Sequence, residues 1–512
     1  MNAGAVRSRG RPAAPVGPKP RPRAVVVGAG VGGLSAAIHL ARRGFRVTVV
    51  EKNARAGGRC ARFTRDGHQF DLGPTLLVLP KLYAQELTQL DEDMYESLDL
   101  QRVDPTYRLM FEDGRSLSLT SDLEAMRAQL EAIEPGSFTG FLEYLEEGRR
   151  HYDLAIDCLV RRPFDTAASF FRPELVRLVF ALKLLVRHYP HLGAYFDDPR
   201  LKAAFTFQDV YMGISPFEAA AIFSFMPYSE LAHGVWFPRG GMYRIVEGLQ
   251  AKAVREGVEF QFGSPVERIL TNAHRAEGVR LAEGRELAAD VVVANADLPY
   301  VYQHLLPPDG QTKKLEGLRY SCSTISFFWG VDRTYAQLGP HTLFMAEDYR
   351  GTFRAIVDQL TLPESPTVYI HAPARLDASM APAGQDTLIG VVPVGHLDRE
   401  GRQDWQDLKA RARQAVLQRL AGIGITDLEA HLKFEVCATP LDWRDRLNLA
   451  RGSTHGLSHT LWQMAYLRPH NRHARWRNLY FAGASTHPGT GLPTVLVSGR
   501  LAAERAAGDL GM

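Results

Sequence analysis

Cysteine is scarce in this 512-residue chain, and the few cysteines are far apart. The four are Cys60, Cys158, Cys322 and Cys437. No C-x-x-C pair and no Cys/His spacing typical of a metal centre occurs, so we expect neither a disulfide framework nor a bound metal. This usage predicts a reducing compartment.

Net charge is also small. The chain has 60 Lys and Arg against 57 Asp and Glu, a formal charge of +3. So slight an excess gives no argument for a nucleic-acid partner. Hydrophobic residues make up 45% of the chain, an ordinary globular balance, and at this length two or three sub-domains are expected.

Long uncharged apolar runs are missing, which argues against a transmembrane helix. The nearest candidate is 173–186, PELVRLVFALKLLV, which three charged side chains interrupt. At helical spacing Arg172, Lys183 and Arg187 fall on one side. That arrangement suits a helix lying in a membrane interface, and a core helix with a basic outer edge is the alternative.

The first 23 residues contain six Lys and Arg, five prolines and no acid. Such a composition is typical of a disordered leader, which we exclude from the fold. It lacks the apolar middle of a secretory signal, so a cytoplasmic location is expected. Its basic charge either contacts anionic lipid or is simply solvated.

A glycine turn is the most informative stretch. The β-branched run at 25–27 leads into Gly28, Gly30 and Gly33, and a helix is predicted from about Val31 to Arg43. The three glycines suit a tight turn, a close approach to a pyrophosphate and close packing of helix on strand. The helix N-terminus favours an anion. An incidental turn is the alternative, because glycine punctuates many loops.

The residues after this turn favour one dinucleotide. A second apolar run ends at Glu51, where a ribose hydroxyl would be held. Gly57, Gly58 and Arg59 follow. They resemble the G-G-R extension of FAD-containing flavoproteins, so FAD is favoured over NAD, with Arg59 clamping phosphate or ribitol. A plain loop with an exposed arginine is the alternative.

Further elements follow from local patterns. The alternating runs of 102–119, with a D-G turn at Asp113 and Gly114, predict a β-hairpin. A helical region is expected over 121–228 and a long helix over 405–422. Strands are predicted near 325–330, 367–371 and 387–394. Near the C-terminus a short strand precedes Gly483, and a helix is predicted to begin at Pro493, where proline suits a first turn.

Four stretches together carry a family resemblance. They are the glycine-rich start, GVWFPRGG at 234–241, TPLDWRDRLN at 439–448, and LRPHN followed by NLYFAGASTHPGTGLP over 467–493. From about Ala24 to Arg505 the chain resembles the bacterial and fungal phytoene desaturases, which bind FAD within the amine-oxidase-like flavoproteins. Thr494 departs from the glycine of many relatives.

The resemblance implies an α/β fold with a discontinuous Rossmann-type FAD-binding domain, a mixed-sheet substrate domain and a helical, membrane-facing part. It further implies that the Val266 backbone holds adenine, and that Gly483, Gly491, Pro493 and Thr494 form the flavin loop. The corresponding division is 24–80, 238–300 and 470–508 for FAD, 81–120 and 301–469 for the substrate, and 121–237 for the helical cap.

No residue stands out as the acid or base. Asp442, Arg444 and Asp445 either order a loop through salt bridges or handle a proton. His487 either orients the flavin loop or acts as a base, and Trp236 lies either in the core or near the flavin.

The leading hypothesis is a desaturase of an acyclic C40 carotenoid, peripherally attached to a membrane surface, with quinone or O2 as electron acceptor. A carotenoid ketolase or other flavin oxidase is a second hypothesis. A prenyl-binding carrier without redox activity is a third, and a carrier would not need the glycines, Glu51 and Arg59.

Overall fold

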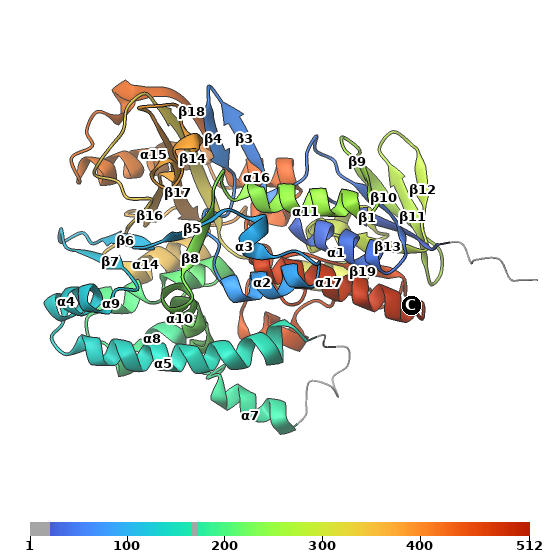
Figure 1. Cartoon of the computed structure of the whole chain (residues 1–512), viewed down its shortest axis with the longest axis horizontal. Coiled ribbons are helices and arrows are strands. Elements are labelled where there is room, and N and C mark those ends of the chain that lie inside the picture. The colour runs from blue at the N-terminus through green and yellow to red at the C-terminus, as the bar shows by residue number, and fades with distance from the viewer. Residues whose placement is uncertain (1–20, 163, 165–172) are drawn as a thin grey trace, which may run out of the picture.

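A computed structural model describes residues 21–162, 164 and 173–512 of the chain. Figure 1 shows a parallel sheet with its helices at one end of the long axis, a larger sheet at the other end, and a group of helices along one side.

The parallel sheet is assembled from distant parts of the chain. Its order is β19-β13-β1-β2-β9, with every neighbouring pair parallel. Alternate residues of β1 enter two different hydrophobic clusters, so both faces are covered, as expected for parallel strands. The strands are β1 (Arg23–Val27), β2 (Arg46–Val50), β9 (Glu259–Gln261), β13 (Val291–Ala294) and β19 (Leu479–Phe481).

Three helices cover one face of this sheet. They are α1 (Val31–Arg42), α11 (Tyr243–Arg255) and α17 (Leu492–Asp509). α1 packs against both of the others. A small antiparallel sheet lies against β13 and is formed by β10 (Val266–Thr271), β11 (Ala276–Leu281) and β12 (Glu286–Ala288). The predicted helix after the glycine turn and the predicted helix at Pro493 are therefore confirmed.

The second sheet has the order β18-β14-β17-β16-β15-β6-β7. Helix α15 (Trp405–Ala421) packs on its central strands. The predicted hairpin is present as β6 and β7, but it joins the sheet through a parallel pairing of β6 with β15, which local pattern did not indicate. The strands are β6 (Tyr107–Met110), β7 (Ser116–Leu119), β14 (Ser323–Val331), β15 (His341–Phe344), β16 (Val368–His371), β17 (Asp386–Val394) and β18 (Leu432–Ala438).

The helical part includes α4 (Leu123–Ile133), α5 (Ser137–Ala155), α7 (Pro173–Ala181) and α10 (Phe225–Ala232). The predicted helix of 173–186 ends earlier than expected, at Ala181. Lys183 has a φ of 48°, and its ammonium contacts Glu147 and lies 3.2 Å from His191 Nε2. Lys183 therefore turns inward, so the predicted one-sided basic stripe does not form, and Arg172 lies outside the described residues.

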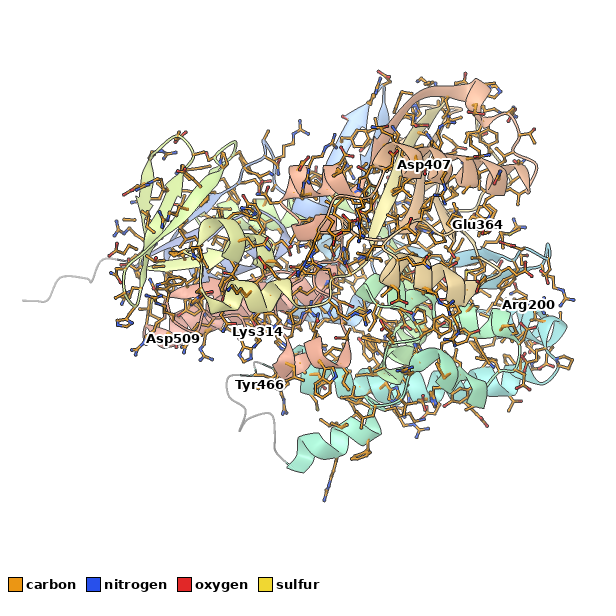
Figure 2. The ribbon with its side chains drawn as sticks, turned by 180° about the vertical axis from the view of Figure 1, so that it is seen from behind. Arg200, Lys314, Glu364, Asp407, Tyr466 and Asp509 are labelled. Atoms are coloured by element: carbon orange, nitrogen blue, oxygen red, sulfur yellow. The ribbon has the colours of Figure 1, made fainter. Side chains whose placement is uncertain are left out.

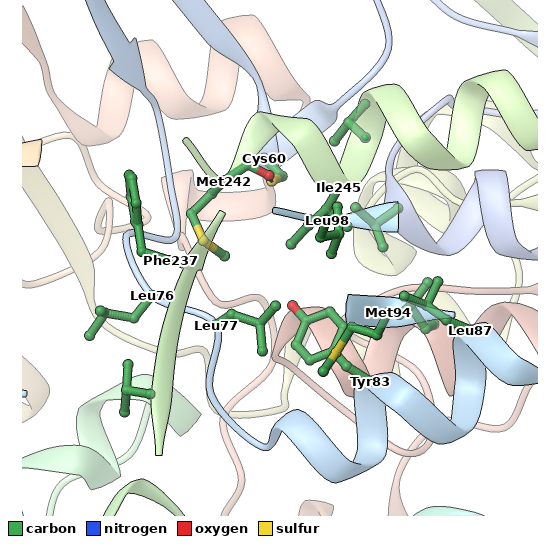
Figure 3. Packing of buried hydrophobic residues seen from close by; sticks show 14 of the residues in the cluster. Cys60, Leu76, Leu77, Tyr83, Leu87, Met94, Leu98, Phe237, Met242 and Ile245 are labelled. Carbon is green, nitrogen blue, oxygen red and sulfur yellow. The ribbon is translucent and has the colours of Figure 1, made fainter. Parts of the chain in front are cut away.

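A hydrophobic cluster fixes the loop that follows the G-G-R motif. Figure 3 shows Cys60 next to Met242, with Leu77 of the segment before α2 (Pro80–Thr88) and Tyr83 of α2 itself facing them. Leu77 pairs with Trp236 of β8 (Val235–Pro238). This packing connects the loop after Arg59 to β8, which follows α10 of the helical part.

Candidate functional site

The glycine turn has the geometry that its sequence predicts. Gly28 has a φ of 98°, which favours glycine. A Cβ on Gly33 would lie 2.1 Å from the Gly28 carbonyl oxygen, and one on Gly30 would lie 2.9 Å from Asn295 Nδ2. No side chain caps α1 and its first turn holds no acid, so its first N–H groups are available to an anion.

Glu51 stands at the far end of the cradle, at the C-terminus of β2. Its Oε2 accepts a hydrogen bond from the Ala29 N–H at 2.8 Å, and its Oε1 accepts one from the Asn53 N–H at 2.9 Å. The Ser264 N–H bonds to the Glu51 carbonyl, which brings Val266 to the same cavity. Carboxylate oxygens have lone pairs to spare, so Glu51 retains capacity for a hydroxyl donor.

Arg59 faces the cavity with few partners. Its guanidinium lies 3.4 Å from the Thr454 carbonyl oxygen and 3.6 Å from Asp297 Oδ1. Asp297 is held separately, since it accepts hydrogen bonds from Ser485 Oγ at 2.7 Å and the Ala450 N–H at 3.1 Å. Burial lowers the pKa of Arg59, and Asp297 opposes this shift. Its fork of donors is thus available to a phosphate.

The loop before α17 forms the opposite wall. Gly483 and Gly491 have φ values of 126° and 110°, and Pro493 occupies the first turn of α17. Thr494 Oγ1 donates to the carbonyls of Thr490 and Gly491, so it stabilises this turn from behind the cavity. Gly491, Leu492, Pro493 and Val495 bring the α17 N-terminus to the cavity.

Arg468 was missed as a functional residue, although it lies in the LRPHN motif. Its side chain is fully buried, and it donates only to carbonyl oxygens of two loops. Among these are the carbonyls of Leu457 on one loop and of Ala484 and Thr486 on the flavin loop. Burial lowers its pKa to about 9. Arg468 thus holds the flavin loop in place. In the sequence, the only sign of this role was an arginine between apolar residues.

One continuous cavity of about 510 Å³ runs from the glycine turn to the large sheet. Most of its lining beyond Arg59 is apolar, with side chains from the sheet and from the helical part. Representative residues are Phe207, Phe328, Leu343, Phe353, Ile389 and Val391.

The structure brings most predicted cofactor residues together. Gly33 and Thr494 lie just behind the cavity wall. Those that line the cavity are Gly28, Gly30, Glu51, Gly58, Arg59, Val266, Gly483, Gly491 and Pro493. Asn295, Asp297 and His455 also line it but were not predicted, because no local motif marks them.

The five weak candidates for proton handling lie outside the cavity lining. Asp442 forms a capping box with Thr439 at the start of α16 (Pro440–Leu447). Arg444 pairs with Asp445 at 2.6 Å on the surface. These contacts lie at the start and on the surface of α16.

Two of these candidates are aromatic. Trp236 packs edge-on against the exposed Tyr95, away from the cavity. His487 places Nε2 2.8 Å from the Arg162 carbonyl oxygen and its ring against Phe164. Burial lowers the pKa of His487 to about 4, which suits a neutral packing residue.

The residues present fit FAD. A pyrophosphate suits the glycine turn, which has no space for Cβ atoms, together with the uncapped helix N-terminus and the sparsely paired Arg59. A ribose hydroxyl suits Glu51. Within the described residues, no group of three or more His, Cys, Asp or Glu side chains is arranged to hold a metal ion.

Comparison with known proteins agrees with this fit. A family model described as flavin containing amine oxidoreductase matches residues 31–507. The chain is 43% identical over 485 residues to a zeta-carotene-forming phytoene desaturase of Myxococcus xanthus, covering 94% of this chain and 93% of that protein. It is 38% identical over 510 residues to the phytoene desaturase of Fusarium fujikuroi, covering 95% and 89%.

Solved structures show the same fold. An oxidoreductase from Methanosarcina mazei superposes with a TM-score of 0.64 at 16% identity, covering 94% of this chain and all of that one. At this identity the likeness concerns the fold alone. From the family model and the two relatives together, the chain belongs to the flavin-containing amine oxidoreductase family, and within it to the carotenoid desaturases.

Proposed function

We propose that this protein is an FAD-dependent desaturase that introduces C=C bonds into an acyclic C40 carotenoid. One observation carries the proposal: a single cavity joins a dinucleotide cradle to an apolar chamber. Bound FAD supplies the hydride acceptor for removing two hydrogens from a C–C bond. The protein orients the chain and keeps the chamber dry. The names of the two relatives supply the substrate class.

The proposed cofactor contacts follow the geometry. The pyrophosphate lies at Gly28, Gly30 and the α1 N-terminus, Glu51 holds the adenosine ribose, and Arg59 binds a phosphate. The Val266 backbone faces the adenine. We also propose the domain division at the boundaries predicted above, since the strands of the parallel sheet fall in its three FAD segments.

We propose that a linear carotenoid reacts in the apolar chamber while the rest of its chain extends toward the surface.

We propose that the substrate enters from a membrane surface at the helical part. Phe180 of α7, Leu185 and Trp462 are 71%, 65% and 76% exposed. Met464 packs against the same hydrophobic cluster as Leu178 and Leu184, so the two exposed segments border one cluster. Figure 2 shows Tyr466 at the same edge of the molecule as the projecting helix. Exposed large apolar groups in one region mark an interaction surface.

This attachment is peripheral. Among the helices of the described residues, none is both long and apolar enough to cross a bilayer. Binding of the triple variant Phe180→Ser/Leu185→Ser/Trp462→Ser to phosphatidylcholine vesicles should be much weaker than that of wild type in co-sedimentation. The variant Val254→Ser removes an apolar side chain on α11 that is 57% exposed and should bind as wild type.

The desaturase proposal is tested with purified protein in vesicles containing phytoene. The FAD-loaded protein should convert phytoene to more conjugated products, identified by absorbance and mass, with a quinone or O2 as acceptor. Parallel samples with lycopene and a 1-hydroxylated carotene identify the substrate, and anaerobic samples with or without quinone identify the acceptor. A protein that takes up no FAD, or that leaves every carotene unchanged with both acceptors, would refute the proposal.

A further inference from the structure

A chain of hydrogen bonds leads from the cavity into the large sheet. Thr75 Oγ1 lies 2.7 Å from the Tyr369 hydroxyl, which lies 2.7 Å from His341 Nδ1. Thr75 and Tyr369 line the cavity, whereas His341 lies behind them and is 1% exposed. Thr75 also shares a loop with Gly73, whose Cβ position lies 2.0 Å from the Arg59 carbonyl oxygen. The chain therefore begins beside the cofactor-binding residues.

The surroundings of His341 suit a neutral imidazole that can accept a proton. Burial and the neighbouring His371 hold the pKa of His341 well below its usual value. The His371 ring stacks on it at 4.5 Å, with Nδ1 of His371 2.9 Å from the Pro340 carbonyl oxygen. The Tyr107 ring lies 5.8 Å away, within the range in which an aromatic ring attracts a cation.

The other titratable groups near the chamber are less suited to accept a proton. Burial raises the pKa of Glu230 to about 8, so this acid is already protonated at neutral pH. Asp71 bonds to Arg62 at 3.1 Å and to the Met242 N–H at 2.6 Å. Asp297 and Glu51 are engaged as described above.

His455 is the remaining rival. It lines the cavity, and burial together with Arg59 lowers its pKa to about 4. The His455 Nδ1 lies 3.2 Å from the Thr454 hydroxyl. Among the hydrogen bonds of the described residues, this contact does not continue into a chain of side-chain hydroxyls like that of Thr75 and Tyr369.

We propose that Thr75, Tyr369 and His341 form the proton outlet of the desaturation, an inference that rests on the proposed function. Desaturation removes a hydride from one carbon and a proton from its neighbour. The electron pair of the second C–H bond becomes the new π bond, and its proton passes to Thr75 Oγ1. The Thr75 hydroxyl proton moves to Tyr369 Oη, and the Tyr369 proton moves to His341 Nδ1.

The product of this transfer is a His341 imidazolium held beside His371 and Tyr107. A weak base suffices, because loss of a hydride makes the neighbouring C–H strongly acidic. The proton returns along the same chain when the reduced cofactor is reoxidised by a quinone or O2, since that reaction consumes one proton. No net charge is then left in the sheet after each turnover.

The test uses the FAD-loaded, full-length protein with phytoene in vesicles under anaerobic single-turnover conditions. Tyr369→Phe interrupts the chain, so the rate should fall by about 10²-fold, the usual lower size of acid–base assistance. Wild type should show a solvent isotope effect in D2O that Tyr369→Phe loses. FAD affinity and phytoene binding, followed by absorbance and fluorescence, should be unchanged in the variant.

Matched variants separate a relay from a structural role. Tyr335→Phe removes a hydroxyl outside the cavity lining and should behave as wild type, because Tyr335 bonds to Asp427 at 3.1 Å and not to Tyr369. His341→Ala should be as slow as Tyr369→Phe and should recover activity on addition of imidazole, which a purely structural histidine would not permit.

Three results would overturn the inference while leaving the desaturase proposal intact. Tyr369→Phe could match Tyr335→Phe in rate and isotope effect, His341→Ala could fail to respond to imidazole, or the loss could fall on His455→Gln instead. A wild-type protein that desaturates no carotene would instead refute the proposed function itself.

Discussion

Removing Arg59 should weaken FAD binding far more than it weakens the fold. Among the described residues its guanidinium has only distant partners, at 3.4 and 3.6 Å, so its donors are available to the cofactor. A hydrogen bond to a charged group contributes about 1.5–3 kcal/mol. Arg59→Ala should therefore raise the Kd for FAD by about 10- to 150-fold. Arg59→Lys keeps the charge but loses the forked pair of donors, so its Kd for FAD should lie between those of wild type and Arg59→Ala.

The fold should tolerate this change because Asp297 retains its bonds from Ser485 and the Ala450 N–H. We expect a stability loss of about 1 kcal/mol, the size of one hydrogen bond. Titration of apoprotein with FAD, followed by flavin fluorescence, measures Kd, and urea unfolding measures stability. Arg444→Ala, at an exposed pair outside the cavity lining, is the control. A wild-type Kd in Arg59→Ala would refute the assignment.

Three further changes probe the fold and the chamber. Gly33→Ala places a Cβ 2.1 Å from a backbone oxygen, so it should lower the free energy of unfolding by about 1–3 kcal/mol and abolish FAD binding. Gly248→Ala, in open space on α11, should raise the free energy of unfolding by about 0.5–1 kcal/mol. Equal melting temperatures of the two variants would contradict this expectation. Because the folded pKa of Glu230 is raised from 4.5 to about 8, the contribution of Glu230 to stability should fall as pH rises through that window, by up to about 4 kcal/mol. The stability difference between wild type and Glu230→Gln should therefore change by about that amount between urea unfolding at pH 5 and at pH 8, and a constant difference would disprove it. Glu86→Ala leaves the buried Arg500 without its 2.8 Å partner and should cost about 3 kcal/mol in the same assay, while a loss below about 1 kcal/mol would count against the pair.

Local sequence was sufficient for the cofactor cradle. Gly28, Gly30 and Gly33 lie within one strand, turn and helix, and the Gly28 carbonyl of the same turn excludes a Cβ at Gly33. The β6–β7 hairpin was predictable for the same reason, since its turn and register depend on neighbouring residues. The helix at Pro493 likewise follows from the residues at its first turn.

Tertiary structure alone decided the rest of the site. Thr75, His341 and Tyr369 meet only because β15 pairs with β16 and the loop after β4 (His68–Asp71) lies against that sheet. Lys183 turned inward because Glu147 and His191, on other helices, outweighed the pattern of its own segment. Periodicity reports which face of an element is buried, but not which distant element covers that face. The amino-acid sequence therefore determined the cofactor class, and long-range packing determined the chamber and the residues that can move a proton from it.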